Sequence, residues 1–453
     1  MMTRRPLLIT ALFVAACSGD DVPGPSGATE SSTGTPPTAS GTGASSGSGS
    51  GGGASSGAEE TGSLDTTSVG STSTTGPAES SSGSGDDSSG STGGLGPVFP
   101  DWADLQLEQS ICDGASYYTP TVAGHDEVFA VGCVRDSGSS APQLYFVSGT
   151  EGVLGQDDTL LARNGNPYLD VALTAWDGRF QASYQHRCTH LPTNSGCIDV
   201  RVYEGLGSRV NDETIFQNSN HNGHPVMAWS GSSYGVAWVS YDDVYFRRLD
   251  DSGNSTADGN VLVGPDPEQP DQRDGARTKI VYHPGLQEYA IFVISGYNLY
   301  RGRVSEAGDV LEAPTLIADQ AYSQTFNGQF VAAALGDEDY LLYHDETNLV
   351  LARVFPEDGG MSQVVVQEGE YRFPSMVAYE DTLLVFRQNP ETGFGEVLAY
   401  DPDLQALPEL SGILGDGEPM IYPQGAVDRE TGTFAVVYQD AEGSVLFRTI
   451  GGG

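Results

Sequence analysis

The chain has 453 residues, of which 20 are basic and 61 acidic, so its formal net charge at pH 7 is −41. A field of this sign repels phosphate backbones and anionic lipid headgroups, which argues against nucleic-acid binding and against docking on acidic membranes. Cations such as Ca²⁺ are attracted, although the same acidity would also keep an exported domain soluble.

The first segment has the organisation of an export signal. Residues 4–5 are arginines, residues 7–14 form an apolar run, and Cys17 follows two alanines. The apolar run is too short to cross a bilayer as a helix. Residues 14–17 read Val-Ala-Ala-Cys and resemble the bacterial lipobox, which implies that the signal peptide 1–16 is removed and that Cys17 is diacylated. An ordinary signal peptide with an incidental cysteine is the alternative.

The lipobox resemblance also implies a location. Acyl chains on Cys17 would attach the chain stably to a membrane. Ser18 follows the cysteine, whereas an Asp there resembles the inner-membrane retention signal of enteric lipoproteins. We therefore expect an outer-membrane lipoprotein of the cell envelope, with display on the cell surface left open. The arginine pair suits the general secretory route and the twin-arginine route alike.

Residues 17–96 are predicted to be a lipid-anchored, disordered linker. From residue 18 on they are almost entirely Ser, Gly, Thr, Pro, Ala and acids, with four large aliphatic residues and no aromatic one. Such a segment cannot bury enough apolar surface to offset the entropy of ordering it. A Gly/Ser-rich chain of this length has a root-mean-square span of about 45–50 Å, which would hold a domain away from the membrane.

Residues 97–453 carry a repeat. The clearest unit has apolar runs at 225–229, 234–238, 244–249 and 261–263, separated by turn residues that include Asp-Asp-Ser-Gly at 250–253. Each run is alternating, β-branched or aromatic, and this pattern predicts four short antiparallel strands. Counterparts of the second strand begin at residues 129, 180, 234, 289, 340, 382 and 434, at intervals of 51, 54, 55, 51, 42 and 52. Units this small cannot bury their own faces, so they must pack as an array.

The ends of the array indicate a closed ring. The seventh unit stops after its third strand at residues 448–450, and one spare strand, 105–108, precedes the first unit. If this strand completes the last unit, hydrogen bonds join the two ends of the array and only protected edges remain. The predicted fold class is all-β: a seven-bladed β-propeller closed by an N-terminal strand and preceded by a disordered Ser/Gly/Thr-rich stalk. An open β-solenoid is the alternative.

The unit also resembles a repeat of secreted bacterial proteins with the pattern Pro-x-Val-Ala-Trp-x-Gly-x-x-Tyr-x-Val-x-Trp. Residues 225–253 match well, and the other units match loosely. The resemblance implies a propeller and no particular activity.

Four cysteines besides Cys17 predict two disulfides, because an even number in an exported domain is typical of such bonds. Cys188 and Cys197 flank a polar loop between the second and third strands of the second unit, and closing that loop is the natural pairing. Cys112 and Cys133 would then join the ring at its seam. Three connectivities are compatible with four cysteines, and their spacing is not typical of zinc sites.

Two loops carry side chains that could bind a metal ion. His221 and His224 form the only close histidine pair, in the loop that enters the third unit. The loop entering the fourth unit could wrap Ca²⁺ with four carboxylates, Asp266, Glu268, Asp271 and Asp274. In both loops hydrogen-bonded or solvated side chains are the favoured interpretation, so no catalytic, cofactor or metal residue is assigned, and Ca²⁺ is kept only as an option.

The sequence favours a non-enzymatic binding or adhesion protein for an unknown protein or glycan ligand. A hydrolase or lyase acting on extracellular polysaccharide is one alternative, and a subunit of a cell-envelope assembly is another. The expected partners are the membrane, through Cys17, and this unknown ligand, with no nucleic acid among them.

Overall fold

The computed structural model describes part of the chain, namely residues 99–112, 120–135, 141–148, 152–157, 171–187, 196–204, 207–218, 222–240, 243–256, 259–265, 277–295, 297–319, 321, 330–345, 347–355, 359–369, 373 and 375–450. The chain divides into two units, Met1–Ser89 and Gly90–Gly453, and every described residue belongs to the second. These residues form strands and one short 3-10 helix, η2 (Pro408–Leu410). Among them, no helix is long and apolar enough to cross a membrane.

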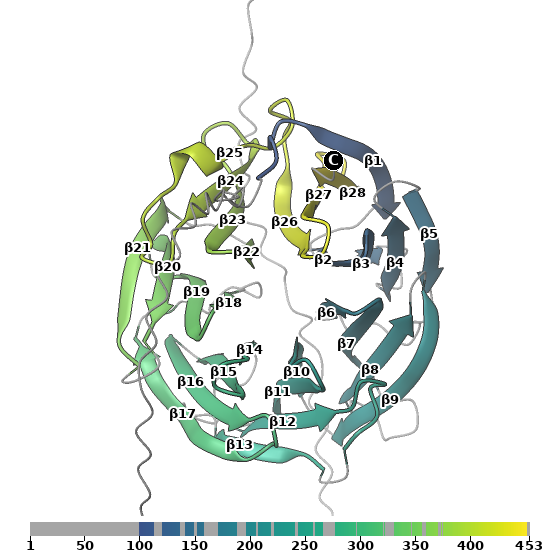
Figure 1. Cartoon of the computed structure of the whole chain (residues 1–453), viewed down its shortest axis with the longest axis vertical. Coiled ribbons are helices and arrows are strands. Elements are labelled where there is room, and N and C mark those ends of the chain that lie inside the picture. Colours follow the sequence, from purple (N-terminus) through teal and green to yellow (C-terminus); the bar gives the residue numbers. More distant parts are fainter. Residues whose placement is uncertain are drawn as a thin grey trace, which may run out of the picture. The chain divides into compact units, whose positions relative to one another are not determined.

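The strands form seven antiparallel sheets of four strands each, arranged as the blades of a β-propeller (Figure 1). Blade 1 contains β2 (Thr121–His125), β3 (Val128–Arg135), β4 (Ala141–Ser148) and β5 (Gly152–Asp157). Blade 2 contains β6 (Val171–Trp176), β7 (Arg179–Arg187), β8 (Gly196–Glu204) and β9 (Ser208–Asn218). Blade 3 contains β10 (Asn222–Trp229), β11 (Tyr234–Ser240), β12 (Asp243–Leu249) and β13 (Val261–Pro265).

The other four blades continue the ring in chain order. Blade 4 contains β14 (Arg277–His283), β15 (Glu288–Ser295), β16 (Asn298–Ser305) and β17 (Val310–Ala318). Blade 5 contains β18 (Val331–Leu335), β19 (Glu338–His344), β20 (Asn348–Val354) and β21 (Met361–Glu368). Blade 6 contains β22 (Ser375–Tyr379), β23 (Thr382–Gln388), β24 (Gly395–Tyr400) and β25 (Gly412–Ile413). Blade 7 contains β26 (Ile421–Asp428), β27 (Thr433–Gln439), β28 (Val445–Ile450) and the first strand of the chain, β1 (Leu105–Cys112).

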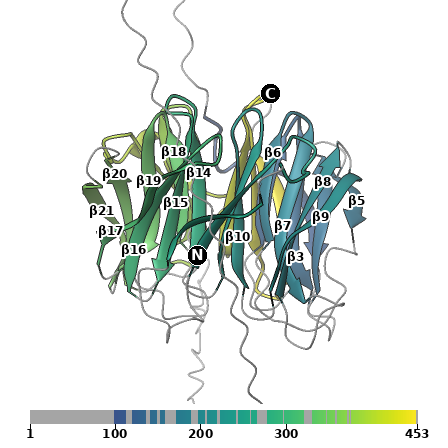
Figure 2. The same ribbon diagram turned by 90° about the horizontal axis from the view of Figure 1, so that it is seen from below.

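The second strand of each blade is the most apolar because both faces of the sheet pack against neighbouring blades. Every residue of β11, β15 and β27 is buried, whereas most of the outer strand β17 is exposed or half-buried. The blades approach closely where glycines leave room for a ring: a Cβ on Gly235 would lie 2.6 Å from Cε1 of Tyr289 in the next blade. The side view in Figure 2 shows the strands running between the two faces of the ring.

The core is divided among the interfaces between blades. The described buried side chains form seven apolar clusters, and each cluster combines residues of two adjacent blades. The cluster between blades 7 and 1 includes Phe129 and Phe447, whose ring centroids lie 5.5 Å apart. No blade therefore has a core of its own, which is why the repeats are stable only as a ring.

The closing strand lies where the sequence predicted it. β1 pairs with β28 in antiparallel register, from Leu105 opposite Ile450 to Cys112 opposite Val445, and becomes the outer strand of blade 7. The strand is longer than the predicted 105–108, because it continues through Cys112. Just before it, the indole Nε1 of Trp102 donates a hydrogen bond to the Leu410 carbonyl oxygen at 2.7 Å. The seven-bladed closed propeller is thus confirmed.

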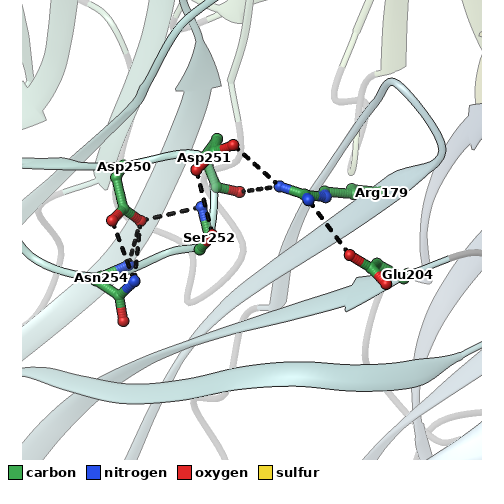
Figure 3. Close-up of polar contacts among 6 residues, drawn as sticks. All are labelled: Arg179, Glu204, Asp250, Asp251, Ser252 and Asn254. Carbon is green, nitrogen blue, oxygen red and sulfur yellow. Dashed lines mark hydrogen bonds and ion pairs between the residues drawn. The ribbon is translucent and has the colours of Figure 1, made fainter.

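The turn between the two outer strands of blade 3 fastens this blade to blade 2. In the predicted Asp-Asp-Ser-Gly turn, the Asp250 carboxylate accepts hydrogen bonds from the backbone N–H groups of Ser252 and Asn254, at 3.0 and 2.8 Å. The Arg179 guanidinium of blade 2 reaches the carbonyl oxygen of Asp251 at 2.9 Å and pairs with Glu204 at 3.3 Å (Figure 3). These acids are occupied by turn and interface contacts, which explains part of the surplus of carboxylates as structural.

Candidate functional site in the central channel

The first strands of all seven blades surround one cavity on the axis of the ring. Its volume is about 300 Å³, and each blade contributes to its lining, with Thr121, Ala172, Val226, Lys279, Val331, Met376 and Gly425 among the lining residues. Figure 1 shows these inner strands, β2, β6, β10, β14, β18, β22 and β26, arranged around the centre. Most of the lining residues lie in the first halves of these strands.

Basic side chains are present in the described part of this lining. His224, Arg277 and Lys279 line the cavity, and no Asp or Glu belongs to its described lining. Lys279 is the only lysine among the 453 residues. The paired carboxylates that glycosidic cleavage needs are therefore not supplied by the described channel-lining residues.

Three residues in the inner strands or next to them adopt a backbone conformation that side chains other than glycine rarely take. His224, Phe373 and Tyr422 have φ angles of +46°, +61° and +53°. Each directly precedes a proline in the sequence. Such strain persists only where the surrounding structure holds it in place, and it is concentrated at ligand sites and clamps.

The rings of two of these residues contact each other beside a glutamine that lines the cavity. Phe373 and Tyr422 meet edge to face with their centroids 4.2 Å apart. The Gln424 side-chain amide donates to the Phe373 carbonyl oxygen at 3.2 Å. Blades 6 and 7 are therefore in contact next to the cavity.

The structure locates some of the predicted site residues. Cys112 and Cys133 are joined by a disulfide with their Cα atoms 6.6 Å apart, and the bond links β1 to β3 across the seam. Cys197 is also disulfide-bonded. Cys17 and Cys188 lie outside the described residues.

The structure describes only part of the two loops that could bind a metal ion. His221 and the four carboxylates at 266, 268, 271 and 274 lie outside the described residues. His224 is 9 % exposed and contacts Arg277. No group of three or more His, Cys, Asp or Glu residues suited to a metal ion is present in the part of the chain that the structure describes.

Sequence reasoning missed Arg277 and Lys279. In the sequence they read as polar positions in an alternating strand, and nothing places them near His224, more than fifty residues earlier. The one available signal was compositional, because a chain that otherwise uses arginine alone has a single lysine at this position.

A second cavity, of about 770 Å³, lies at the seam of the ring. Its walls include Phe99 and Trp102 from the segment before β1, and Phe394, Leu410 and Ile413 from blade 6. It is an open groove between the closing segment and a blade with a very short fourth strand. Asp101, Glu409 and Asp416 also line it, but among the described residues they form no group suited to a metal ion.

A buried cluster of charged groups lies between blades 4 and 5. The Asp339 carboxylate accepts from His283 Nε2 at 2.7 Å and from Arg301 Nε at 2.9 Å, and these three side chains are 1, 0 and 3 % exposed. Burial lowers the pKa of His283, but the hydrogen bond and charge of Asp339 raise it by more, so the pKa stands above its ordinary value. A cluster closed to solvent in this way joins blades and does not meet a ligand.

Neither a protein-family profile nor a curated protein sequence matches this chain. Among solved structures, a prolyl endopeptidase is similar over 73 % of this chain and 47 % of its own, with 13 % identity and a TM-score of 0.41. Prolyl oligopeptidase B from Galerina marginata is similar over 72 % of this chain and 48 % of its own, with 9 % identity and a TM-score of 0.40. The β-propeller domain of Cps50 (Swd1) from Myceliophteria thermophila is similar over 75 % of this chain and 99 % of its own, with 11 % identity and a TM-score of 0.44. The chain spans about half the length of the two peptidase chains, and at these identities the likeness concerns the fold alone.

Proposed function

We propose that this chain is an exported, lipid-anchored binding protein whose propeller captures an extracellular protein or glycan in its central channel. Cys17 would carry the anchor, and residues 17–96 would hold the propeller at a distance from the membrane. The observation that carries the proposal is the cavity of about 300 Å³ to which all seven blades contribute. Ligand pockets are commonly concave sites of this kind, with a few polar groups set among apolar ones.

The lining fits binding better than a purely structural role. Apolar side chains such as Val226, Val331 and Met376 alternate with the polar Thr121, Ser375 and Gln424. The strained residues His224, Phe373 and Tyr422 support the same interpretation, since their conformation is maintained at some cost.

Attachment to the membrane is tested at Cys17. We expect the wild-type chain, expressed in a bacterium that processes lipoproteins, to incorporate labelled palmitate and to enter the detergent phase in phase partitioning. Cys17→Ser should abolish both properties, whereas the matched control Ser18→Ala should retain them. Acyl labelling of the Cys17→Ser variant equal to wild type would overturn the anchoring proposal.

Binding is tested with the soluble full-length Cys17→Ser chain on glycan arrays and in pull-downs with envelope and extracellular polymers. Ala332→Trp would fill part of the channel, and Leu316→Trp, on the exposed outer strand β17, adds the same ring elsewhere. We expect capture that Ala332→Trp weakens and Leu316→Trp leaves unchanged, with both variants folded by circular dichroism. Equal capture by the two variants would place the ligand outside the channel.

A further inference from the structure

The outer strand of blade 5 has one partner strand. β21 pairs with β20 in antiparallel register, from Met361 opposite Val354 to Glu368 opposite Asn348. It is the last strand of its sheet, and among the described residues no strand pairs with its other edge. Figure 1 shows β21 on the circumference of the ring. The backbone N–H and C=O groups of an outer edge are a template for a further strand.

The other outer strands have features that hinder such pairing. Short length, charged side chains, proline and glycine all protect or weaken a sheet edge. β25 has two residues, β13 ends in Gly-Pro, and β17 contains Pro314. β5 has two glycines among its six residues. β1 contains Glu108, and β9 contains Arg209 and Asp212.

β21 differs from these six strands in composition. Residues 362–367 read Ser-Gln-Val-Val-Val-Gln, with no charged residue, no proline and no glycine. Segments of this length with high β-propensity and low charge pair readily with copies of themselves when they lie on an exposed edge. β21 has one shift of register against β20, between Val365 and Gln367. This bulge bends the strand but gives its outer edge no partner.

The strand is held in place on its inner side. The Val364 and Val366 side chains pack against the apolar cluster between blades 5 and 6. The Tyr343 hydroxyl donates to Oε1 of Gln363 at 3.2 Å. Val365, between the two packed valines, is 51 % exposed. An edge fixed in this way loses little conformational freedom when a second strand pairs with it.

The segment is complementary to itself. Residues 363–367 read Gln-Val-Val-Val-Gln, which is the same in both directions. In an antiparallel pair about a two-fold axis through Val365, each valine therefore lies opposite a valine and each glutamine opposite a glutamine. Glu368 lies opposite Ser362 of the second copy, so like charges do not face each other. A chain with a net charge of −41 repels its own copies except where a charge-free surface of this kind is available.

We propose that two copies of this chain pair edge to edge through β21, so that their fifth blades form one continuous sheet. The contact is isologous, because the same strand contributes from both copies. The inference goes beyond the proposed function, and no residue of the channel takes part in it. A dimer would present two channels to one polymer, which raises avidity without any new contact to the ligand.

Sedimentation velocity of the full-length Cys17→Ser chain tests the pairing over a range of concentrations. We expect a reversible dimer. Val365→Lys should raise its dissociation constant by about tenfold or more, because the two-fold axis places the two ammonium groups opposite each other. Val210→Lys makes the same change on β9, where Val210 is 44 % exposed, and should dimerise as the parent chain does. Circular dichroism verifies that both variants are folded.

A cysteine on the proposed axis gives a second measurement. Residues opposite each other on antiparallel strands have Cα atoms about 4.5–5.5 Å apart, a spacing that a disulfide can bridge. Under mild oxidation Val365→Cys should therefore form a covalent dimer on a non-reducing gel, and Val210→Cys should not.

Three results would overturn the inference. The parent chain could remain a monomer at every concentration. It could form a dimer that Val365→Lys retains, which would assign the contact to another face of the ring. It could also stay monomeric and show slowed hydrogen exchange of the β21 amides only after envelope extract is added, which would assign this edge to a strand of another protein.

Discussion

Replacing Asp339 by Asn tests whether the buried cluster between blades 4 and 5 holds the ring together. Asn keeps the shape of the side chain and removes the charge that faces His283 and Arg301. Both partners are at most 3 % exposed, so water cannot replace the lost interaction. Leaving a buried cation without its partner costs about 3–5 kcal/mol, and we expect a loss of this size in the free energy of unfolding.

An ion pair between blades 5 and 6, whose acid is exposed to solvent, provides the matched control. Arg353 Nη1 lies 2.8 Å from Asp403 Oδ1, and the Asp403 side chain is 80 % exposed. Pairs of this kind contribute about 0–1 kcal/mol, so Asp403→Asn should have little effect. Urea unfolding followed by tryptophan fluorescence measures both variants. Equal costs for Asp339→Asn and Asp403→Asn would refute the reasoning from burial.

The same cluster predicts the direction of a pH effect. The pKa of His283 is raised in the folded protein because Asp339 outweighs the effect of burial. A raised folded pKa contributes stability that is complete below the unfolded pKa of about 6.5 and is lost as pH rises through the folded value. The wild-type chain should therefore lose stability as the pH rises through the folded pKa of His283. The stability of Asp339→Asn should depend less on pH over the same range. A wild-type profile that the substitution leaves unchanged would exclude His283 as the group responsible.

Three further predictions concern the seam and the charge of the ring. Replacing both Cys112 and Cys133 by Ser should lower the free energy of unfolding by about 3 kcal/mol, because the disulfide joins residues separated by 21 positions. Urea unfolding measures the loss, and an unchanged midpoint would show that the hydrogen bonds of β1 close the ring alone. Trp102→Ala should cost about 3–5 kcal/mol, because the ring is 4 % exposed and contacts Phe386 and Phe434; the half-buried Trp176→Ala is the control. Raising NaCl from about 10 to 150 mM shortens the screening length from about 30 to 8 Å, so the melting temperature should rise, and an equal rise with sucrose at matched osmolality would argue against charge repulsion as the cause.

The fold could be predicted because the physical requirement recurs in every unit. Each second strand must be apolar on both faces, since a neighbouring blade covers each face, and this produces runs such as 234–238 and 289–293 that can be aligned along the chain. In such an array the spare strand before the first unit is needed to complete the last unit, and β1 does pair with β28 of that unit. The extension of β1 to Cys112 was not predictable, because the polar residues 108–110 give no apolar pattern.

The channel site could not be predicted for a related reason. Its residues come from different blades, and each blade contributes only two to four of them. β14 begins with Arg-Thr-Lys-Ile, which in the sequence is typical of a solvent-exposed strand end. Only closure of the ring places this part of β14 at the axis. His224 was singled out as half of a histidine pair, whereas the structure places it against Arg277 of the next blade.

The charge of the channel follows from the geometry of a ring as well as from any ligand. Away from the axis a carboxylate can lie beside an arginine of its own blade, as Glu288 on β15 lies beside Arg303 on β16 and Glu338 on β19 beside Arg353 on β20. At the axis seven strands converge, so several acids there would lie within a screening length of one another and would repel across a cavity with little water. A ring with a surplus of acids is therefore more stable with those acids away from its axis. The described lining of the channel follows this rule, because it contains Arg277 and Lys279 and no carboxylate.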